Sequence, residues 1–281
     1  MASAVQSAFP SAAGAAPEEP EVLYALAGQV ATIMLNRPER MNTISGPMLG
    51  LLSQLLLKAD ADPEVRVVIL TGTGRAFCAG LDLSEATRPR GGAITAGAGA
   101  AADLDLRNAP PIVLFNMTKP VICALNGSAA GYGMDTALVC DVRLMAEDAK
   151  MAAAFTRRGV VPESGGTWLL PRLLGWSKAA ELIFTGRTLG ARECVELGLA
   201  SRAVPKDELM AAAQALAREI AANAPLAVQA SKRMMRMGLS ETFGDHVHHV
   251  FLQLLPLLRS QDAAEGMKAF MEKRPPTFTG R

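Results

Sequence analysis

The chain has 281 residues, of which 50% are hydrophobic and 20% are charged. This is enough apolar material for a substantial core, in one domain or two. The 28 basic and 27 acidic side chains give a formal net charge of +1, so no strong overall field favours nucleic acid or an anionic membrane surface. No apolar run is as long as a membrane span. We therefore expect neither nucleic acid nor a membrane as a partner, and an anionic ligand would need a local cluster of charges.

The four cysteines are Cys78, Cys123, Cys140 and Cys194, and they form no CxxC pair. Their spacing lacks the metal and redox patterns and favours small buried thiols in a reducing compartment. The first basic residue is Arg37, so the N-terminus lacks the cationic start of a secretion signal and the arginines of a mitochondrial transit peptide. We expect a cytoplasmic protein.

The N-terminal third begins with a segment that favours disorder. Residues 1–20 are mostly Ala, Ser, Pro and Glu, with few large apolar groups, and predict a disordered tail. Two β-rich runs at 22–26 and 30–35 flank Gly28, which predicts a hairpin. Helical spacing of apolar residues follows over 49–57.

Continuous apolar runs at 65–70, 121–125 and 139–145 are typical of strands covered on both faces. Helical segments between them indicate βαβ units and a mostly parallel sheet. Residues 91–102 are rich in Gly and Ala and predict a mobile loop beside the binding site.

The pattern from Ala191 onward is helical almost throughout. Helices are predicted near 207–223, 226–237, 241–259 and 262–272. We therefore divide the folded chain into a core over 21–200 and a helical region over 201–281.

Two glycine-containing segments, 71–83 and 126–135, directly follow the predicted strands at 65–70 and 121–125. Glycine permits turns closed to other residues and lets a ligand approach the backbone. A helix that begins near Gly131 would point free N–H groups and its positive dipole end at that ligand. Two such N–H groups that converge on one oxygen form an oxyanion hole. Neither segment is a P-loop, and the dinucleotide-binding glycine pattern is incomplete.

Taken in order, these and other segments resemble the enoyl-CoA hydratase/isomerase (crotonase) family, from about residue 22 to residue 278. The matching segments are 36–38, 41–42, 76–83, 119–133, 140–141, 159–167, 170–172, 185–187, 198–200 and 270–274. The resemblance implies an α/β fold, a crotonase-like spiral of ββα repeats followed by a helical trimerisation region. It also implies a homotrimer or a dimer of trimers.

The resemblance further implies an acyl-CoA thioester as substrate. Coenzyme A is then part of the substrate, and no separate cofactor or metal is expected. The family's oxyanion hole falls on the backbone N–H groups of Leu81 and Tyr132. Ala79, Leu81, Asp82 and Tyr132 match substrate-binding positions, together with Met41 and Arg40. Arg40 matches a position that meets the CoA phosphate in relatives, and a solvated surface arginine is the alternative interpretation.

The carboxylates separate the possible reactions. Family hydratases use two glutamates, and these fall here on Asp135 and on Phe155, which cannot transfer protons. This departure disfavours ordinary hydration. Glu163 stands where members that move double bonds, such as Δ3-Δ2-enoyl-CoA isomerases, carry Glu or Asp. Isomerisation needs only one acid–base group, so we expect Glu163 to be catalytic. The alternative is a charge at a helix N-terminus.

Other interpretations stay open at this point. Asp135 can be a second catalytic acid, a polar group of the pocket, a nucleophile of the dehalogenase type, or a helix-start aspartate without a catalytic role. The function can be a hydratase that pairs Asp135 with Glu163, or a non-catalytic acyl-CoA binder. RNA binding is disfavoured by the near-zero charge. His246, His248 and His249 form the histidine cluster, and a metal there lacks a third ligand.

Overall fold

The computed structural model describes residues 19–82 and 106–281. Most of the predicted tail over 1–20 and the whole Gly/Ala-rich segment 91–102 lie outside these described residues. The chain from residue 19 begins with a hairpin of β1 (Val22–Ala27) and β2 (Val30–Leu35), which pair antiparallel around Gly28. The predicted hairpin is therefore confirmed.

Helix α1 (Gly46–Ala61) is longer than the predicted 49–57. Its N-terminus is capped by Ser45, whose hydroxyl oxygen accepts a hydrogen bond from the Met48 backbone N–H at 3.1 Å. Buried Leu52 and Leu56 continue one apolar face through the middle of the helix. The cap and this face explain why the helix extends at both ends beyond the predicted segment.

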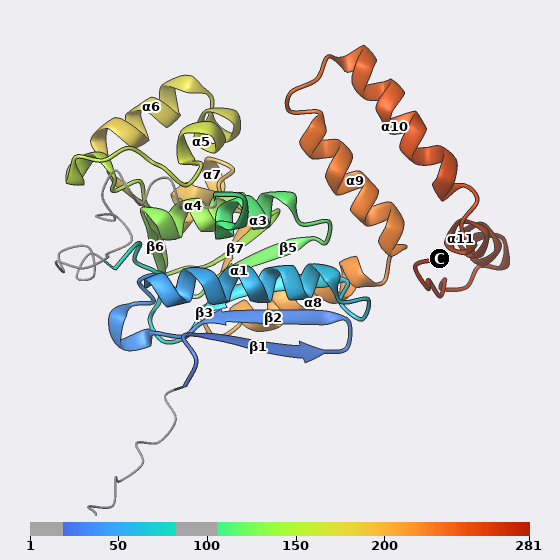
Figure 1. Ribbon diagram of the computed structural model, residues 1–281, viewed down its shortest axis with the longest axis horizontal. Coiled ribbons are helices and arrows are strands. Elements are labelled where there is room, and N and C mark those ends of the chain that lie inside the picture. Colours follow the sequence, from blue (N-terminus) through green and yellow to red (C-terminus); the bar gives the residue numbers. More distant parts are fainter. Residues whose placement is uncertain (1–18, 83–105) are drawn as a thin grey trace, which may run out of the picture.

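Two sheets form the core of the fold (Figure 1). The first has the order β1-β2-β3-β5-β7-β10, where β3 is Val67–Gly72, β5 Val121–Leu125, β7 Val142–Ala146 and β10 Arg202–Val204. The second has the order β4-β6-β8-β9, where β4 is Ala76–Cys78, β6 Ser128–Ala130, β8 Lys150–Ala152 and β9 Thr188–Gly190.

From β3 to β8, successive strands alternate between the two sheets, and a helix follows each pair. The pairs β3/β4, β5/β6 and β7/β8 are followed by α3 (Pro110–Asn116), α4 (Tyr132–Val139) and α5 (Gly166–Leu174). The remaining helices of this part are α6 (Trp176–Thr185) and α7 (Ala191–Glu196), with short 3-10 helices at Pro38–Arg40, Leu106–Asn108 and Thr156–Arg158. This arrangement confirms the predicted α/β spiral of ββα repeats.

The structure corrects three local predictions. The third buried strand begins at Val142 and not at Val139, because Val139 still belongs to α4. The segments after the first two buried strands are not loops alone, since they contain β4 and β6. The predicted helical region also includes a strand, β10, whose Arg202 pairs with Leu144 of β7 in the core sheet.

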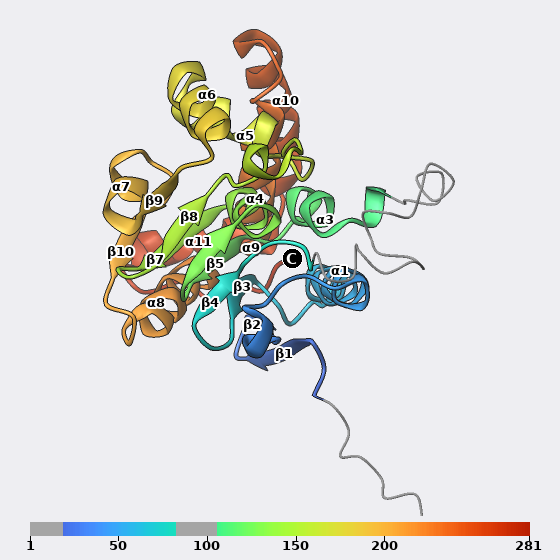
Figure 2. The same ribbon diagram turned by 90° about the vertical axis from the view of Figure 1, so that its left-hand side faces the viewer.

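The middle strands of the larger sheet are buried on both faces. Ile69, Leu70, Ile122 and Leu125 are fully buried, and each such side chain contributes roughly 1.5–3 kcal/mol by leaving water. Helix α8 (Leu209–Ala221) packs across β2, β3, β5 and β7, whereas α1, α3 and α4 form a row in which each helix packs on the next (Figure 2). This core holds the strand ends that carry the site.

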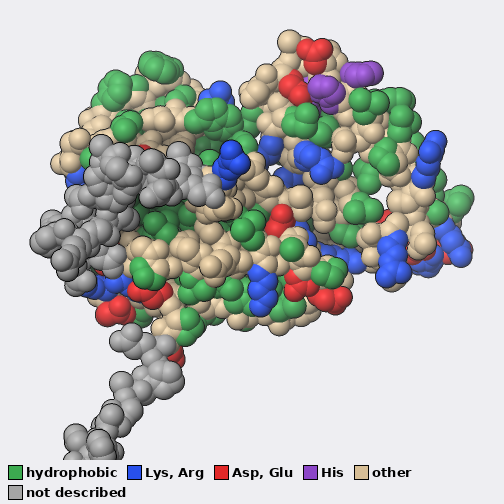
Figure 3. All heavy atoms as spheres, in the orientation of Figure 1, with side chains coloured by type: hydrophobic (Ala, Val, Ile, Leu, Met, Phe, Trp, Pro, Cys, Tyr) green, Lys and Arg blue, Asp and Glu red, His purple; other side chains and the backbone are tan. Residues whose placement is uncertain are grey.

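The last three helices form an arm that extends away from the sheets (Figure 1). They are α9 (Pro225–Met237), α10 (Phe243–Leu257) and α11 (Gln261–Glu272), close to the predicted bounds. No residue of α10 is buried, and Phe243 and Phe251 are 85% and 56% exposed. Hydrophobic side chains are spread over this arm, and the histidines lie at its upper end (Figure 3).

No helix within 19–82 and 106–281 is long and apolar enough to cross a membrane. The four cysteines are all buried and unpaired, as the sequence predicts. Burial raises the pKa of the Cys78 thiol to about 12, so this thiol stays protonated and behaves as a small apolar group. The cytoplasmic location stays a prediction.

Candidate active site

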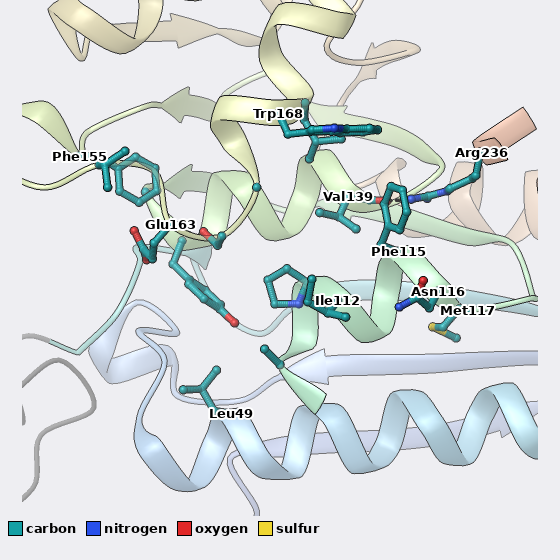
Figure 4. A pocket seen from close by; sticks show the side chains of 18 of the residues that line it. Leu49, Ile112, Phe115, Asn116, Met117, Val139, Phe155, Glu163, Trp168 and Arg236 are labelled. Carbon is teal, nitrogen blue, oxygen red and sulfur yellow. Dashed lines mark hydrogen bonds between the residues drawn. The ribbon is translucent and has the colours of Figure 1, made fainter. Parts of the chain in front are cut away.

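A cavity of about 1370 Å³ lies between the spiral core and the arm. Its walls come from α1, α3, α4, α5 and α9, together with residues 79–81 and the segment 154–165. The lining is mainly apolar, and in Figure 4 Glu163 and Phe155 lie at one end while Asn116, Met117 and Arg236 lie at the other. We call these the Glu163 end and the Arg236 end. A mainly apolar cavity with a few polar groups is typical of a small-molecule binding site.

Two backbone N–H groups, those of Leu81 and Tyr132, border the cavity beside each other. The N–H of Asp82 donates to the Ile44 carbonyl at 2.9 Å, and Ile44 N–H donates to Gly80, so Leu81 turns its own N–H away from this bridge. Tyr132 is the first residue of α4, where an N–H has no intrahelical acceptor. Within the described chain, neither N–H has a protein acceptor.

The backbone brings these two groups together because β4 and β6 pair in parallel, with Cys78 beside Ala129. Both strands therefore end at the same edge. A Cβ placed on Gly80 would lie only 4.0 Å from the Tyr132 nitrogen. Gly131 precedes α4 with φ +53° and ψ −123°, a conformation that essentially only glycine adopts. The predicted donors, Leu81 and Tyr132, therefore lie beside each other at the cavity, and their role as an oxyanion hole stays a prediction.

Glu163 reaches the cavity from the loop before α5. Its side chain is accessible, yet desolvation by the surrounding apolar groups raises the pKa of its carboxyl, while its own backbone N–H lowers that pKa in part. The charge of Glu163 also helps to raise the pKa of the Tyr132 phenol, behind burial and the Cys78 thiol. A carboxylate with a raised pKa in the same cavity wall as two free N–H donors can accept and return a proton.

Asp135 is only 1% exposed and does not line the cavity. Its Oδ2 atom accepts hydrogen bonds from Ser164 Oγ at 2.8 Å and from the Gly166 backbone N–H at 3.0 Å. Burial raises the pKa of this carboxyl to about 6, and the charge of Glu163 adds to the increase, whereas hydrogen bonds from Ser164 and Gly166 oppose it. Asp135 therefore lies outside the cavity wall, against Ser164 and Gly166, which follow Glu163 in the chain.

The other sequence-predicted residues occupy different places. Phe155 lines the Glu163 end of the cavity, where it contributes an apolar wall. Ala79 lines the cavity and donates its N–H to the Met41 carbonyl at 3.1 Å. Arg40 and Met41 are exposed in the adjoining turn and are not part of the cavity wall.

Asp82 is also absent from the wall, because its carboxylate is turned toward Arg37. The Arg37 Nη2 atom lies 3.1 Å from Asp82 Oδ2, and both side chains are largely buried. Arg37 also donates to the Thr43 carbonyl at 2.7 Å. This pair connects the 37–43 turn to the segment that carries Leu81, so the structure gives Asp82 a role in holding that segment.

The Arg236 end of the cavity is basic, which the sequence reasoning missed. Asp141 lies 2.7 Å from Lys232 Nζ and 2.9 Å from Arg236 Nη2, so two cations share one carboxylate. Arg236 also stacks on Phe115, with its Cζ atom 4.4 Å from the ring centroid. Lys232 and Arg236 are four residues apart on α9, and this helical spacing was the available signal.

The histidines face Glu241, which lines the cavity. The Nδ1 atoms of His246 and His249 each lie 3.0 Å from a Glu241 carboxylate oxygen, whereas His248 packs against the His249 ring. In the described residues no group of three or more His, Cys, Asp or Glu side chains is arranged to hold a metal ion. A carboxylate, that of Glu241, therefore lies against both His246 and His249.

A family model described as enoyl-CoA hydratase/isomerase matches residues 26–281. The chain belongs to this family. It is 37% identical over 259 residues to 1,2-epoxyphenylacetyl-CoA isomerase of Escherichia coli strain K12, an alignment that covers 90% of this chain and 95% of that protein. It is 38% identical over 259 residues to carnitinyl-CoA dehydratase of Proteus mirabilis, with 90% and 96% covered.

Solved structures agree with this assignment. The crystal structure of an enoyl-CoA hydratase from Bacillus anthracis superposes with a TM-score of 0.85 at 33% identity, and covers 93% of this chain and all of that one. The family resemblance and the crotonase-like fold are thereby confirmed. As a member of the enoyl-CoA hydratase/isomerase family, the protein is an acyl-CoA enzyme.

The buried carboxylate gives a prediction about stability. Because the pKa of Asp135 rises from 3.8 to about 6 on folding, the folded state binds more protons between these pH values. The contribution of Asp135 to the free energy of unfolding is thus fully present below pH 3.8. This contribution, about 3 kcal/mol, is lost as the pH rises from 3.8 through 6. Asn does not titrate, so the stability of Asp135→Asn should not fall in this way. Relative to the wild type, its free energy of unfolding should therefore increase between pH 4 and pH 7. Urea denaturation of both proteins across this range is the measurement, and a constant difference would contradict it.

Proposed function

We propose that the protein is an enoyl-CoA isomerase that moves a double bond from C3 to C2 of an acyl-CoA thioester through Glu163. The observation that carries the proposal is a single unpaired carboxylate, Glu163, in the described cavity wall that also contains Leu81 and Tyr132. The other carboxylate in the described wall, Glu241, lies 3.0 Å from Nδ1 of both His246 and His249. One acid–base group suffices for isomerisation, whereas hydration needs water activation and proton delivery together.

The proposed reaction proceeds in two proton transfers. The Glu163 carboxylate removes a proton from C2, and the electron pair moves onto the thioester oxygen, which the N–H groups of Leu81 and Tyr132 stabilise. The protonated Glu163 then returns the proton to C4, and the double bond forms between C2 and C3. The raised pKa of Glu163 suits both steps, because the group must be a base first and an acid second.

The relatives named above are called isomerase, dehydratase and hydratase, so the reaction must be inferred from this chain's own residues. Two placements disfavour a hydratase that pairs Asp135 with Glu163. Asp135 is outside the cavity wall, and the other hydratase position is occupied by the apolar ring of Phe155. A non-catalytic acyl-CoA binder would retain the cavity, and calorimetric titration beside a turnover assay separates it from an enzyme.

The wall also restricts the acyl group. Phe115 and Trp168 meet edge to face with ring centroids 5.6 Å apart, and one face of each already holds an arginine, Arg236 or Arg172. Lys232 adds a further cation at the Arg236 end. Arg236 and Lys232 would repel a positively charged acyl group at this end of the cavity. We therefore propose an acyl group without a fixed positive charge, and a CoA phosphate that meets the exposed Arg40 beside Ala79.

The first functional prediction concerns Glu163. Glu163→Gln preserves size and polarity, so the oxyanion donors remain and thioester affinity should change little. Isomerisation of a 3-enoyl-CoA should fall by roughly 10²–10⁴-fold, because the proton carrier is lost. Steady-state kinetics with a matched control, Glu241→Gln, checks this, since that change removes the other carboxylate of the wall. Asp135→Asn should cost less than Glu163→Gln, and the reverse ranking would refute the isomerase assignment.

Hydration gives a second prediction. Because Phe155 cannot deliver or accept a proton, water addition to crotonyl-CoA should be slower than in a dedicated hydratase by roughly 10²–10⁴-fold. The measurement is the loss of the enoyl thioester absorbance with enzyme in excess. Turnover at an ordinary hydratase rate would show that Asp135 and Glu163 act as an acid pair after all.

Assembly gives a third prediction. A helix such as α10 that buries none of its own residues in the monomer, yet exposes Phe251 and Leu254, requires a partner surface. We propose a homotrimer or a dimer of trimers, with the arm as the contact. Sedimentation at micromolar concentration should show a trimer-based species. Phe251→Glu should weaken it, whereas Gln253→Glu on the same helix should not, and a stable wild-type monomer would contradict the proposal.

A further inference from the structure

Asp135 is a buried carboxylate that a substrate in the cavity does not touch. Glu163 and Ser164 line the cavity, whereas Asp135 lies behind them and is 1% exposed. An acid or nucleophile must come within hydrogen-bond reach of the reacting atoms. The placement therefore separates Asp135 from the chemistry, and its contacts indicate what it does instead.

Two hydrogen-bond partners of the carboxylate lie just after Glu163 in the chain. Oδ2 accepts from Ser164 Oγ at 2.8 Å and from the Gly166 N–H at 3.0 Å, so the two bonds hold the first and third residues after Glu163. A Cβ on Gly166 would lie 2.4 Å from Asp135 Oδ1. Only glycine therefore lets the carboxylate rest against the backbone at the start of α5.

The other side of this contact is rigid. Asp135 belongs to α4, all eight residues of which are buried. Tyr132, which carries one oxyanion donor, lies one helical turn before Asp135 on the same helix. A single buried helix thus presents an N–H group to the thioester oxygen and holds the loop that presents Glu163. The distance between the two halves of the site is set through Asp135.

We propose that Asp135 is a positioning residue: it fixes the Glu163 loop relative to the oxyanion hole through Ser164 and Gly166, and it transfers no proton to the substrate. The inference rests on the proposed acid–base role of Glu163. Catalysis is sensitive to such a restraint, because a displacement of about 1 Å in a catalytic group can cost on the order of 10²-fold in rate.

The test compares three variants that change the acceptor, the charge and one donor separately. Asp135→Ala removes the acceptor, Asp135→Asn removes the charge but keeps a carbonyl acceptor, and Ser164→Ala removes one donor and keeps the carboxylate. Leu138→Ala is the matched control, because it removes a buried side chain from the same helix without a hydrogen bond to the loop. Amide hydrogen exchange over 160–168 and steady-state kinetics with a 3-enoyl-CoA are measured on each.

Asp135→Ala should accelerate exchange over 160–168 and lower kcat by about 10- to 100-fold, with KM within about threefold of the wild type. Asp135→Asn should restore most of the protection and most of kcat, and Ser164→Ala should give a smaller loss of both. Leu138→Ala should lower the thermal midpoint without either effect. Ser164→Ala keeps the test decisive if Asp135→Ala does not fold.

Two results would overturn the proposal. The first is an Asp135→Asn enzyme as inactive as Asp135→Ala while the loop stays protected, which would make Asp135 a proton-transfer group. The second is unchanged exchange and kcat in both Asp135→Ala and Ser164→Ala. Failure of the proposed function has a different signature, because an active Glu163→Gln enzyme would refute the role of Glu163 while the exchange data still report whether Asp135 holds the loop.

Discussion

The arrangement of the site depends on where two short parallel strands end. Strands β4 and β6 each have three residues, and their pairing brings the Leu81 segment and the start of α4 to one edge of the smaller sheet. Helix α4 packs against both strands and against α3 and α5. Its burial fixes its direction, and the cavity, the N–H donors and the Glu163 loop all take their positions from it.

Several groups in this region are placed at a free-energy cost. Asp135 is buried as an ionisable group, and the Tyr132 hydroxyl is buried in the described chain without a hydrogen-bond partner. An unpaired buried polar group costs about 1–3 kcal/mol. The apolar core of the larger sheet offsets this cost.

The sequence predicts the parts that depend on local pattern and on motif order. Buried strands at Val67–Gly72 and Val121–Leu125 and the helices of the arm are found within a few residues, because apolar periodicity and Pro or Gly boundaries mark them. The three-residue strands of the second sheet are too short to show any period. Local sequence patterns also do not reveal contacts between distant segments. Ser164 is 29 residues from Asp135, and Arg236 is 95 residues from Asp141. Glu163 is predicted as the acid–base group from its motif position, whereas the role proposed for Asp135 depends on which face of α4 meets the loop.

The proposed use of main-chain N–H groups as the oxyanion donors has a consequence for how the enzyme can diverge. Every amino acid except proline supplies the same N–H, so side chains at positions 81 and 132 can be exchanged without loss of the group proposed to hold the enolate. Selection can then reshape the acyl-facing surface step by step while the activation of the thioester persists. The range of acyl groups that such an enzyme can come to accept is then limited more by the backbone geometry that places the N–H groups than by the identity of the residues that line the cavity.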